Sequence, residues 1–137
     1  MTPAPRLIAA VAVGGALGAL ARWSLGVLYP DHTGAFPWTT LGINVAGSFV
    51  LGLLPAIGAV RRRQLLTVAV GPGVLGGFTT LSSYAVQCRA LLASGRVGLA
   101  TAYLLGTLVA CLAAVALADH WSTPDERAEL AAEGGDE

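Results

Sequence analysis

The feature that most constrains this chain is a series of four apolar stretches, each long enough to cross a lipid bilayer. A helix needs about 20 apolar residues to span roughly 30 Å of hydrocarbon. Such stretches lie at residues 7–28, 38–60, 65–92 and 97–118. Only 12% of the residues are charged, against roughly 25% in soluble domains. Because backbone polar groups in lipid must be satisfied within the chain, each span is predicted to be a helix.

The sequence therefore predicts an all-α integral membrane protein. The connections are short and contain turn residues, so consecutive helices are expected to run antiparallel, as one four-helix domain over residues 1–120. Six of the eight acidic residues lie in 121–137, which is expected to form a polar, acidic tail. The first span follows a single arginine, as in a signal peptide, but three further spans make it a retained helix. We expect a multi-pass protein of the inner or plasma membrane.

The distribution of arginines only weakly favours one orientation of the chain across the membrane. Placing the N-terminus in the cytoplasm puts five arginines on that side and three on the other, a small bias under the positive-inside rule. Insertion in both orientations would give such a bias, and so would burial of Arg22 and Arg89 in the bundle. The only basic run, at 61–63, is interpreted as a loop anchor, so no nucleic-acid partner is expected.

The spans contain polar residues but no Asp, Glu or His. Proton-coupled export of cationic drugs needs a carboxylate within the membrane, and a catalytic dyad or a metal site built from side chains needs comparable groups. The sequence thus predicts neither an enzyme nor such an exporter. Hydroxyls and a carboxamide are neutral hydrogen-bond donors, which suit a small anion because they can replace its hydration shell.

Two polar stripes recur at intervals of four residues along the second and fourth spans: Thr40, Asn44 and Ser48, and Tyr103, Thr107 and Cys111. A Ser or Thr in a membrane helix commonly bonds to a carbonyl of its own helix, which is the simpler interpretation for each one alone. Asn44 cannot satisfy its amide so easily, and either an interhelical or a functional role stays open. Cys88 and Cys111 are interpreted as small packing residues rather than a disulfide.

The third span contains the stretch "GVLGGFTTLSSYAVQ" at 73–87. Each Gly costs about 1 kcal/mol relative to Ala in a helix, and adjacent β-branched threonines help little. We therefore expect this helix to be broken near its middle. A break frees backbone carbonyls, which are natural ligands for a hard monovalent cation such as Na⁺.

With these motifs, the chain resembles the CrcB/Fluc fluoride channels over essentially its whole length. The resemblance rests on "GGALGALARW" in the first span, "TLGINVAGSFVLG" in the second and "GGFTTLSSY" in the third. It implies an antiparallel dimer of two oppositely inserted four-helix chains that passively exports fluoride and reduces its toxicity. It also implies a structural Na⁺ on the dimer axis.

The resemblance assigns roles to individual residues. The expected fluoride pore comprises Asn44, Leu81, Tyr84, Ser82, Ser83, Thr40, Tyr103 and Thr107. Gly76 and Thr79 match the positions whose main-chain carbonyls bind the Na⁺. Leu81 and Tyr84 occupy the places of two phenylalanines whose ring edges contact fluoride in the family.

Leu81 departs from the family pattern because it has no ring. This departure and the arginine bias motivate the hypothesis that the chain pairs with a second, dissimilar family member rather than with itself. A non-conducting or partner-dependent subunit is the alternative to a complete channel. A small multidrug exporter is the less favoured alternative, because the spans contain no acid.

Overall fold

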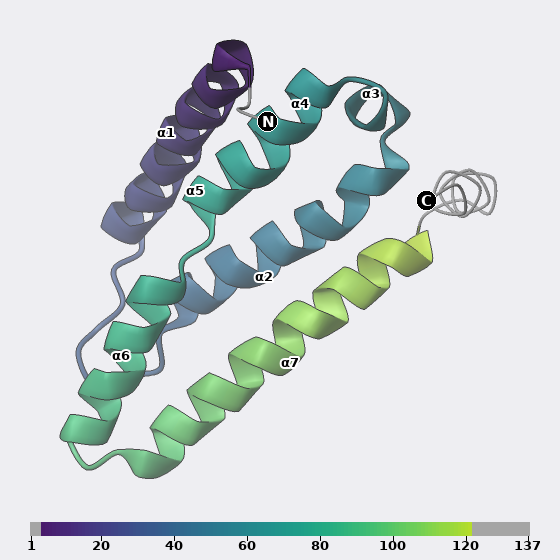
Figure 1. Cartoon of the computed structure of the whole chain (residues 1–137). Helices are drawn as coiled ribbons and strands as arrows, with labels where there is room; N and C mark the ends of the chain where they lie inside the picture. The colour runs from purple at the N-terminus through teal and green to yellow at the C-terminus, as the bar shows by residue number, and fades with distance from the viewer. Residues whose placement is uncertain (1–3, 122–137) are drawn as a thin grey trace.

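The structure is a computed structural model that describes residues 4–121, and it is built from four long helical spans (Figure 1). The spans cover Pro5–Leu28, Trp38–Ala56, Gln64–Ala93 and Val97–Trp121, and each is apolar enough to cross a membrane. No strand occurs within residues 4–121. The predicted all-α fold with four spans is confirmed. The predicted acidic tail lies outside the described residues, apart from Trp121 at the end of the last helix.

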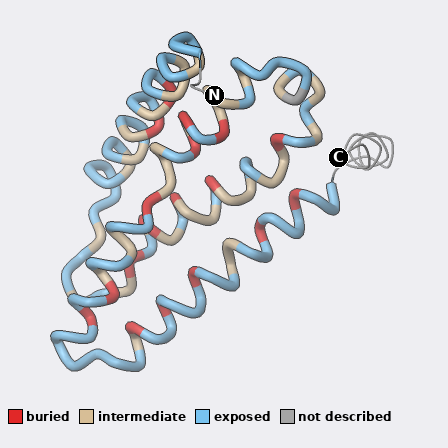
Figure 2. The backbone as a smooth tube through the Cα atoms, viewed as in Figure 1, coloured by how far each residue is buried: buried red, intermediate tan, exposed pale blue. Residues whose placement is uncertain are grey.

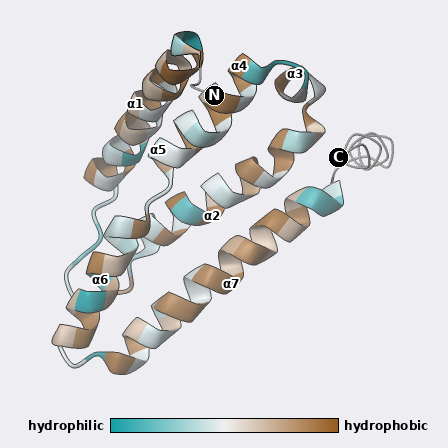
Figure 3. Ribbon diagram, viewed as in Figure 1, coloured by the Kyte–Doolittle hydropathy of each residue, from teal (hydrophilic) through white to brown (hydrophobic). Residues whose placement is uncertain are grey.

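Most of the apolar surface of the helices is uncovered. α7 (Val97–Trp121) is apolar along nearly its whole length (Figure 3), yet buried positions are few on it and on α1 (Pro5–Leu28) (Figure 2). Leu105, Leu108 and Leu112 of α7 are all more than half exposed. Such a surface is stable in hydrocarbon rather than in water. The chain is therefore a multi-pass membrane protein.

The second span ends earlier than the sequence predicts. α2 (Trp38–Leu53) continues into a short 3₁₀ turn, η1 (Leu54–Ala56), and Ile57 then adopts an extended conformation. Pro55 lies in that turn and has no N–H to donate to a continuing helix. The remaining predicted residues, up to 60, belong to the separate short helix α3 (Gly58–Arg61).

The third span consists of four consecutive helical pieces and a break. α4 (Gln64–Val68) leads into a π-helical segment, η2 (Ala69–Leu75), then α5 (Gly76–Phe78), and α6 (Leu81–Ala93) follows the break. The π-helical segment was not predicted. It contains Pro72. In an α-helix, a proline ring clashes with the carbonyl four residues earlier, and the wider π-helical turn relieves this clash.

Glycines bring the helices close together. A methyl group at Gly14 or Gly18 of α1 would collide with the carbonyls of Ala69 or Val74 in η2. On α2, a methyl at Gly52 would lie 2.9 Å from Cβ of Ala118 on α7. α2 thus packs against α7, while α1 packs against the first half of the third span. This leaves the break facing the middle of α2.

Candidate functional site

The break in the third span lies at Thr79 and Thr80. Both residues are extended, with φ/ψ of −73°/157° and −144°/115°. Thr80 then starts α6 by accepting a hydrogen bond from the Ser83 N–H to its hydroxyl, at 3.1 Å. The helix is interrupted where the glycine- and threonine-rich stretch predicts it.

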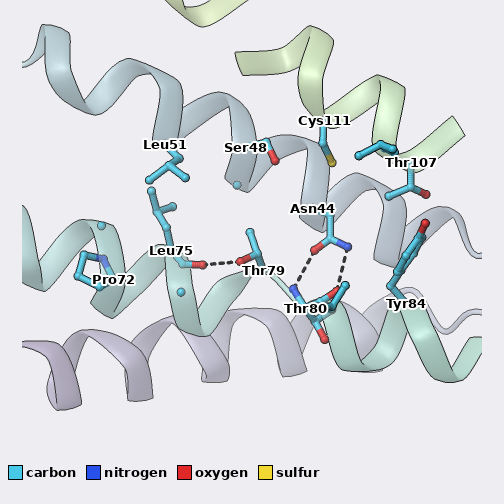
Figure 4. Close-up of a pocket in the computed structure, with 15 residues that line it drawn as sticks. Asn44, Ser48, Leu51, Pro72, Leu75, Thr79, Thr80, Tyr84, Thr107 and Cys111 are labelled. Atoms are coloured by element: carbon cyan, nitrogen blue, oxygen red, sulfur yellow. Dashed lines mark hydrogen bonds between the residues drawn. The ribbon is translucent and has the colours of Figure 1, made fainter. Parts of the chain in front are cut away.

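The side chain of Asn44 closes the break from the α2 side. Its Nδ2 donates to the Thr80 carbonyl at 3.0 Å, and its Oδ1 accepts from the Thr80 N–H at 2.8 Å (Figure 4). One carboxamide thus satisfies both main-chain groups of an extended residue, as a neighbouring β-strand would. Unsatisfied backbone groups cost several kcal/mol each in a bilayer, so this pair of bonds stabilises the interruption.

Two carbonyls before the break, those of Leu75 and Gly77, also accept hydrogen bonds. The Leu75 carbonyl accepts from the N–H and from the hydroxyl of Thr79, both at 2.9 Å. The Gly77 carbonyl accepts from Nε of Arg22 on α1, at 3.1 Å. Arg22 therefore caps the broken helix from α1.

The Gly76 carbonyl is different. In a continuous α-helix it would accept from the Thr80 N–H, but that N–H is directed to Asn44. No other hydrogen-bond donor reaches this carbonyl from the part of the chain that the structure describes. Carbonyl oxygens without donors are suitable ligands for Na⁺, and the residues expected to bind it, Gly76 and Thr79, border the pocket described next. The donor set therefore fits the implied cation.

A pocket of about 470 Å³ lies over the break, between α2, the third span and α7. It is mainly apolar, and none of the described residues that line it is charged. The lining comes from α2 (Asn44, Gly47, Ser48, Leu51), from the third span (Gly71, Pro72, Leu75, Gly76, Thr79, Thr80, Leu81, Tyr84) and from α7 (Thr107, Leu108, Cys111). Its labelled polar side chains come from α2, from the break, from α6 and from α7 (Figure 4).

Thr107 stands out among the polar residues of this pocket. It is only 5% exposed, and its hydroxyl has no hydrogen-bond partner within residues 4–121. Thr101, six residues earlier on the same helix, bonds to its own helix at Val97, at 3.0 Å, as hydroxyls in membrane helices usually do. A buried hydroxyl without a partner is uncommon, and this one belongs to a residue that lines the pocket.

The residues predicted from the start of α6 divide between the pocket and the cap. Leu81 and Tyr84 line the pocket; Leu81 is 79% exposed, and the Tyr84 hydroxyl donates to the Leu104 carbonyl at 2.7 Å. The hydroxyls of Ser82 and Ser83 lie within 3.3 Å and 3.1 Å of the Thr80 hydroxyl, and neither serine lines the pocket.

Thr40 and Tyr103 also lie outside the pocket, in a partly buried polar network at one end of the bundle. The Asp31 carboxylate accepts from the N–H groups of Thr39 and Thr40 and from the Thr40 hydroxyl. Gln87 Nε2 donates to Asp31 and to Thr40, and Gln87 Oε1 accepts from the Tyr103 hydroxyl at 2.8 Å. This network joins the start of α2 to α6 and α7.

The sequence reasoning missed Asp31 and Gln87. Asp31 lies between the first two spans, and an acid before the start of a helix is a common cap. Gln87 is a second carboxamide inside a span and follows Ser83 at an interval of four, the same signal that identified Asn44. Cys88 packs in the core beside Tyr103, as predicted, whereas Cys111 lines the pocket; both thiols are free.

Comparison with known proteins identifies the family. The profile described as "CrcB-like protein, Camphor Resistance (CrcB)" matches residues 9–118. "Fluoride-specific ion channel FluC 1" of Streptomyces coelicolor is 47% identical over 119 residues, which cover 85% of this chain and 77% of that protein. A FluC protein of Thermus thermophilus is 50% identical over 102 residues, 72% of this chain and 80% of the relative. "Fluoride-specific ion channel FluC 2" of Nocardia farcinica is 42% identical over 124 residues, which cover 87% of this chain and 89% of that protein. The chain therefore belongs to the CrcB-like protein family.

Proposed function

We propose that this chain is a fluoride-selective channel, which lets fluoride leave the cell passively and so reduces fluoride toxicity. The observation that carries the proposal is the buried, unpartnered hydroxyl of Thr107 in an uncharged pocket that Asn44 also lines. Relatives that cover most of this chain's length are named fluoride-specific ion channels, which supports fluoride as the ion. Pumping and enzymatic chemistry have no role in this proposal.

Fluoride is small and strongly hydrated, so a selective path has to replace its water with several fixed donors. The Asn44 carboxamide has two N–H groups, and only one is used by the Thr80 carbonyl. The second N–H and the Thr107 hydroxyl are the donors that we propose for the ion in the pocket. The ring of Tyr84, whose edge is electropositive, lies in the same lining.

Ser82 and Ser83 are proposed to act at the mouth of this path. The Ser83 hydroxyl accepts from the Thr80 hydroxyl, so its own hydrogen can be donated to an arriving ion. Thr40 and Tyr103 are proposed to support the path from beyond the pocket, because the network that joins them through Gln87 holds α2, α6 and α7 together. Within the pocket, an anion meets neutral donors, which release it more readily than a fixed positive charge would.

We further propose that two copies of the chain assemble as an antiparallel dimer with a Na⁺ ion between them. The main-chain carbonyls of Gly76 and Thr79 in each copy would bind this ion, which supplies a fixed positive charge near the path. The Gly76 carbonyl, which has no donor, supports this assignment. One chain provides too few oxygens for a hard cation, so a second copy would complete the ligand set.

Leu81 favours a second candidate function, a subunit that conducts only with a dissimilar partner. Its apolar side chain is 79% exposed at the pocket, where the family pattern has a ring. A partner with a ring at this position would restore the missing electropositive edge. The alternatives differ in what the chain does by itself.

A growth assay tests the proposed function. The chain is expressed alone in bacteria that lack their own fluoride exporter, and growth is measured with increasing fluoride. Restored growth supports a self-sufficient channel, provided that Asn44→Asp does not restore it. Restored growth only when a second family member is present supports the partner-dependent subunit, and no rescue in either case contradicts the proposal.

A further inference from the structure

We propose that Asn44 is also a positioning residue for the cation site: its side chain keeps the third span open and so keeps the Gly76 carbonyl available to Na⁺. This inference rests on the proposed function, since the cation belongs to the proposed channel. It assigns to one side chain a part in both anion passage and cation binding.

The Gly76 carbonyl and the Asn44 side chain compete for one N–H group, that of Thr80. The Gly76 carbonyl and the Thr80 N–H are four residues apart, the spacing that an α-helix bonds directly. The Thr80 N–H instead donates to Asn44 Oδ1 at 2.8 Å, and the Thr80 carbonyl accepts from Asn44 Nδ2 at 3.0 Å. Asn44 therefore removes the helical partner of Gly76 and holds Thr80 in an extended conformation.

The carbonyls on either side of Gly76 are already satisfied. Thr79 donates twice to Leu75, and Arg22 donates to Gly77. The Gly76 carbonyl lies between these two satisfied groups and has no donor among the described residues. Of the three consecutive carbonyls at residues 75–77, only that of Gly76 is thus left for a cation.

Close packing holds Asn44 against the break. Gly47, three residues after Asn44 on α2, lies directly under Thr79, and a methyl group there would collide with Cγ2 of Thr79. Thr80 is buried and Asn44 is half-buried, so water competes little for their two hydrogen bonds. Without the Asn44 carboxamide, the Gly76 carbonyl is the acceptor to which the Thr80 N–H would return, and the helix would extend across the break.

The test measures thermal unfolding of the purified full-length chain in detergent, with increasing NaCl replaced isotonically by N-methylglucamine chloride. A ligand that binds only the folded state raises the melting temperature with its concentration. We expect the parent protein to be stabilised by Na⁺. Asn44→Ala should lose this response or weaken the apparent Na⁺ affinity by about tenfold or more, as changes beside metal ligands commonly do.

Thr107→Val is the matched control. Thr107 lines the same pocket and is a proposed fluoride donor, but its hydroxyl makes no hydrogen bond to the break, so the Na⁺ response of this variant should equal that of the parent. If Asn44→Ala does not fold, Asn44→Gln replaces it, because it displaces the same carboxamide by one methylene. An unchanged Na⁺ response in the Asn44 variant would overturn the inference, and so would a parent protein that Na⁺ does not stabilise.

Fluoride efflux separates this inference from the proposed function. A parent protein that conducts no fluoride, yet shows a Na⁺ response that Asn44→Ala abolishes, contradicts the channel and supports the inference. A conducting parent whose Asn44→Ala variant keeps the full Na⁺ response supports the channel and overturns the inference.

Discussion

Asn44 and Thr80 are joined by two hydrogen bonds although 36 positions separate them in the sequence. These bonds attach the middle of α2 to the break of the third span, and they fix one wall of the pocket. Asn44, a polar residue within the second span, thus stabilises the interrupted helix of the third span. The second N–H of the same carboxamide is the group that we propose to contact fluoride.

Replacing Asn44 with Asp should abolish fluoride efflux while keeping nearly the same shape. Like charges about 4 Å apart repel by about 4 kcal/mol at an effective dielectric constant of about 20, so a fall of at least about a hundredfold is expected. The measurement is the initial efflux rate from liposomes with matched amounts of protein. Undiminished efflux through this variant would remove Asn44 from the ion path.

Thr107→Val should slow efflux without weakening the fold. The substitution removes the unpartnered hydroxyl and keeps the volume, so the ion loses one donor. Hydrogen bonds to charged groups contribute about 1.5–3 kcal/mol, which corresponds to a rate lower by roughly tenfold to a hundredfold. Thr101→Val on the same helix is the control, because that hydroxyl is exposed and bonded to Val97. Equal rates for the two variants would contradict a role for Thr107.

Cys111 should make the channel sensitive to a small thiol reagent. Its side chain lines the pocket, whereas Cys88 is 6% exposed in the core beside Tyr103, and thiol reactions follow exposure. Methyl methanethiosulfonate should therefore reduce fluoride efflux in the parent protein and leave a Cys111→Ser variant unaffected. Mass spectrometry should find the added methylthio group on Cys111 and not on Cys88. Full efflux with Cys111 completely modified would place the ion path elsewhere.

Gly18→Ala should destabilise the chain by about 1–3 kcal/mol, as overpacking of a tight contact does. The added methyl group collides with the Val74 carbonyl of η2, and no flexible side chain can move aside there. Gly26→Ala on the same helix is the control, because nothing lies within 4 Å of its added methyl group. It should be neutral or stabilise by up to about 1 kcal/mol. Reversible unfolding in detergent checks both, and a tolerated Gly18→Ala would show that α1 does not depend on close contact with η2.

Much of the fold could be predicted from the sequence, because apolar length and helix-breaking residues are local properties. The four spans and the break at Thr79 and Thr80 follow from them directly. The π-helical turn around Pro72 was missed, since a proline inside a span predicts a distortion but not its kind. The early end of the second span has a local cause too, Pro55, which the hydropathy pattern obscures.

The site could be predicted only in part, because its contacts join distant segments. Spacing along α2 put Thr40 and Asn44 on one stripe, yet the structure places Thr40 in a network with Gln87 and Asn44 on the break. Arg22 shows the same limit, since its partner Gly77 is 55 positions away. Periodicity assigns a residue to a helix face, but tertiary packing decides which neighbour that face meets.

The measurement that tests the central claim most directly is ion efflux from liposomes that contain only this chain, followed with fluoride and chloride electrodes. A fluoride-selective channel should give rapid passive loss of fluoride, negligible loss of chloride, and no need for a proton gradient. Equal permeability to both halides, or no fluoride efflux from protein that is folded and inserted, would contradict it.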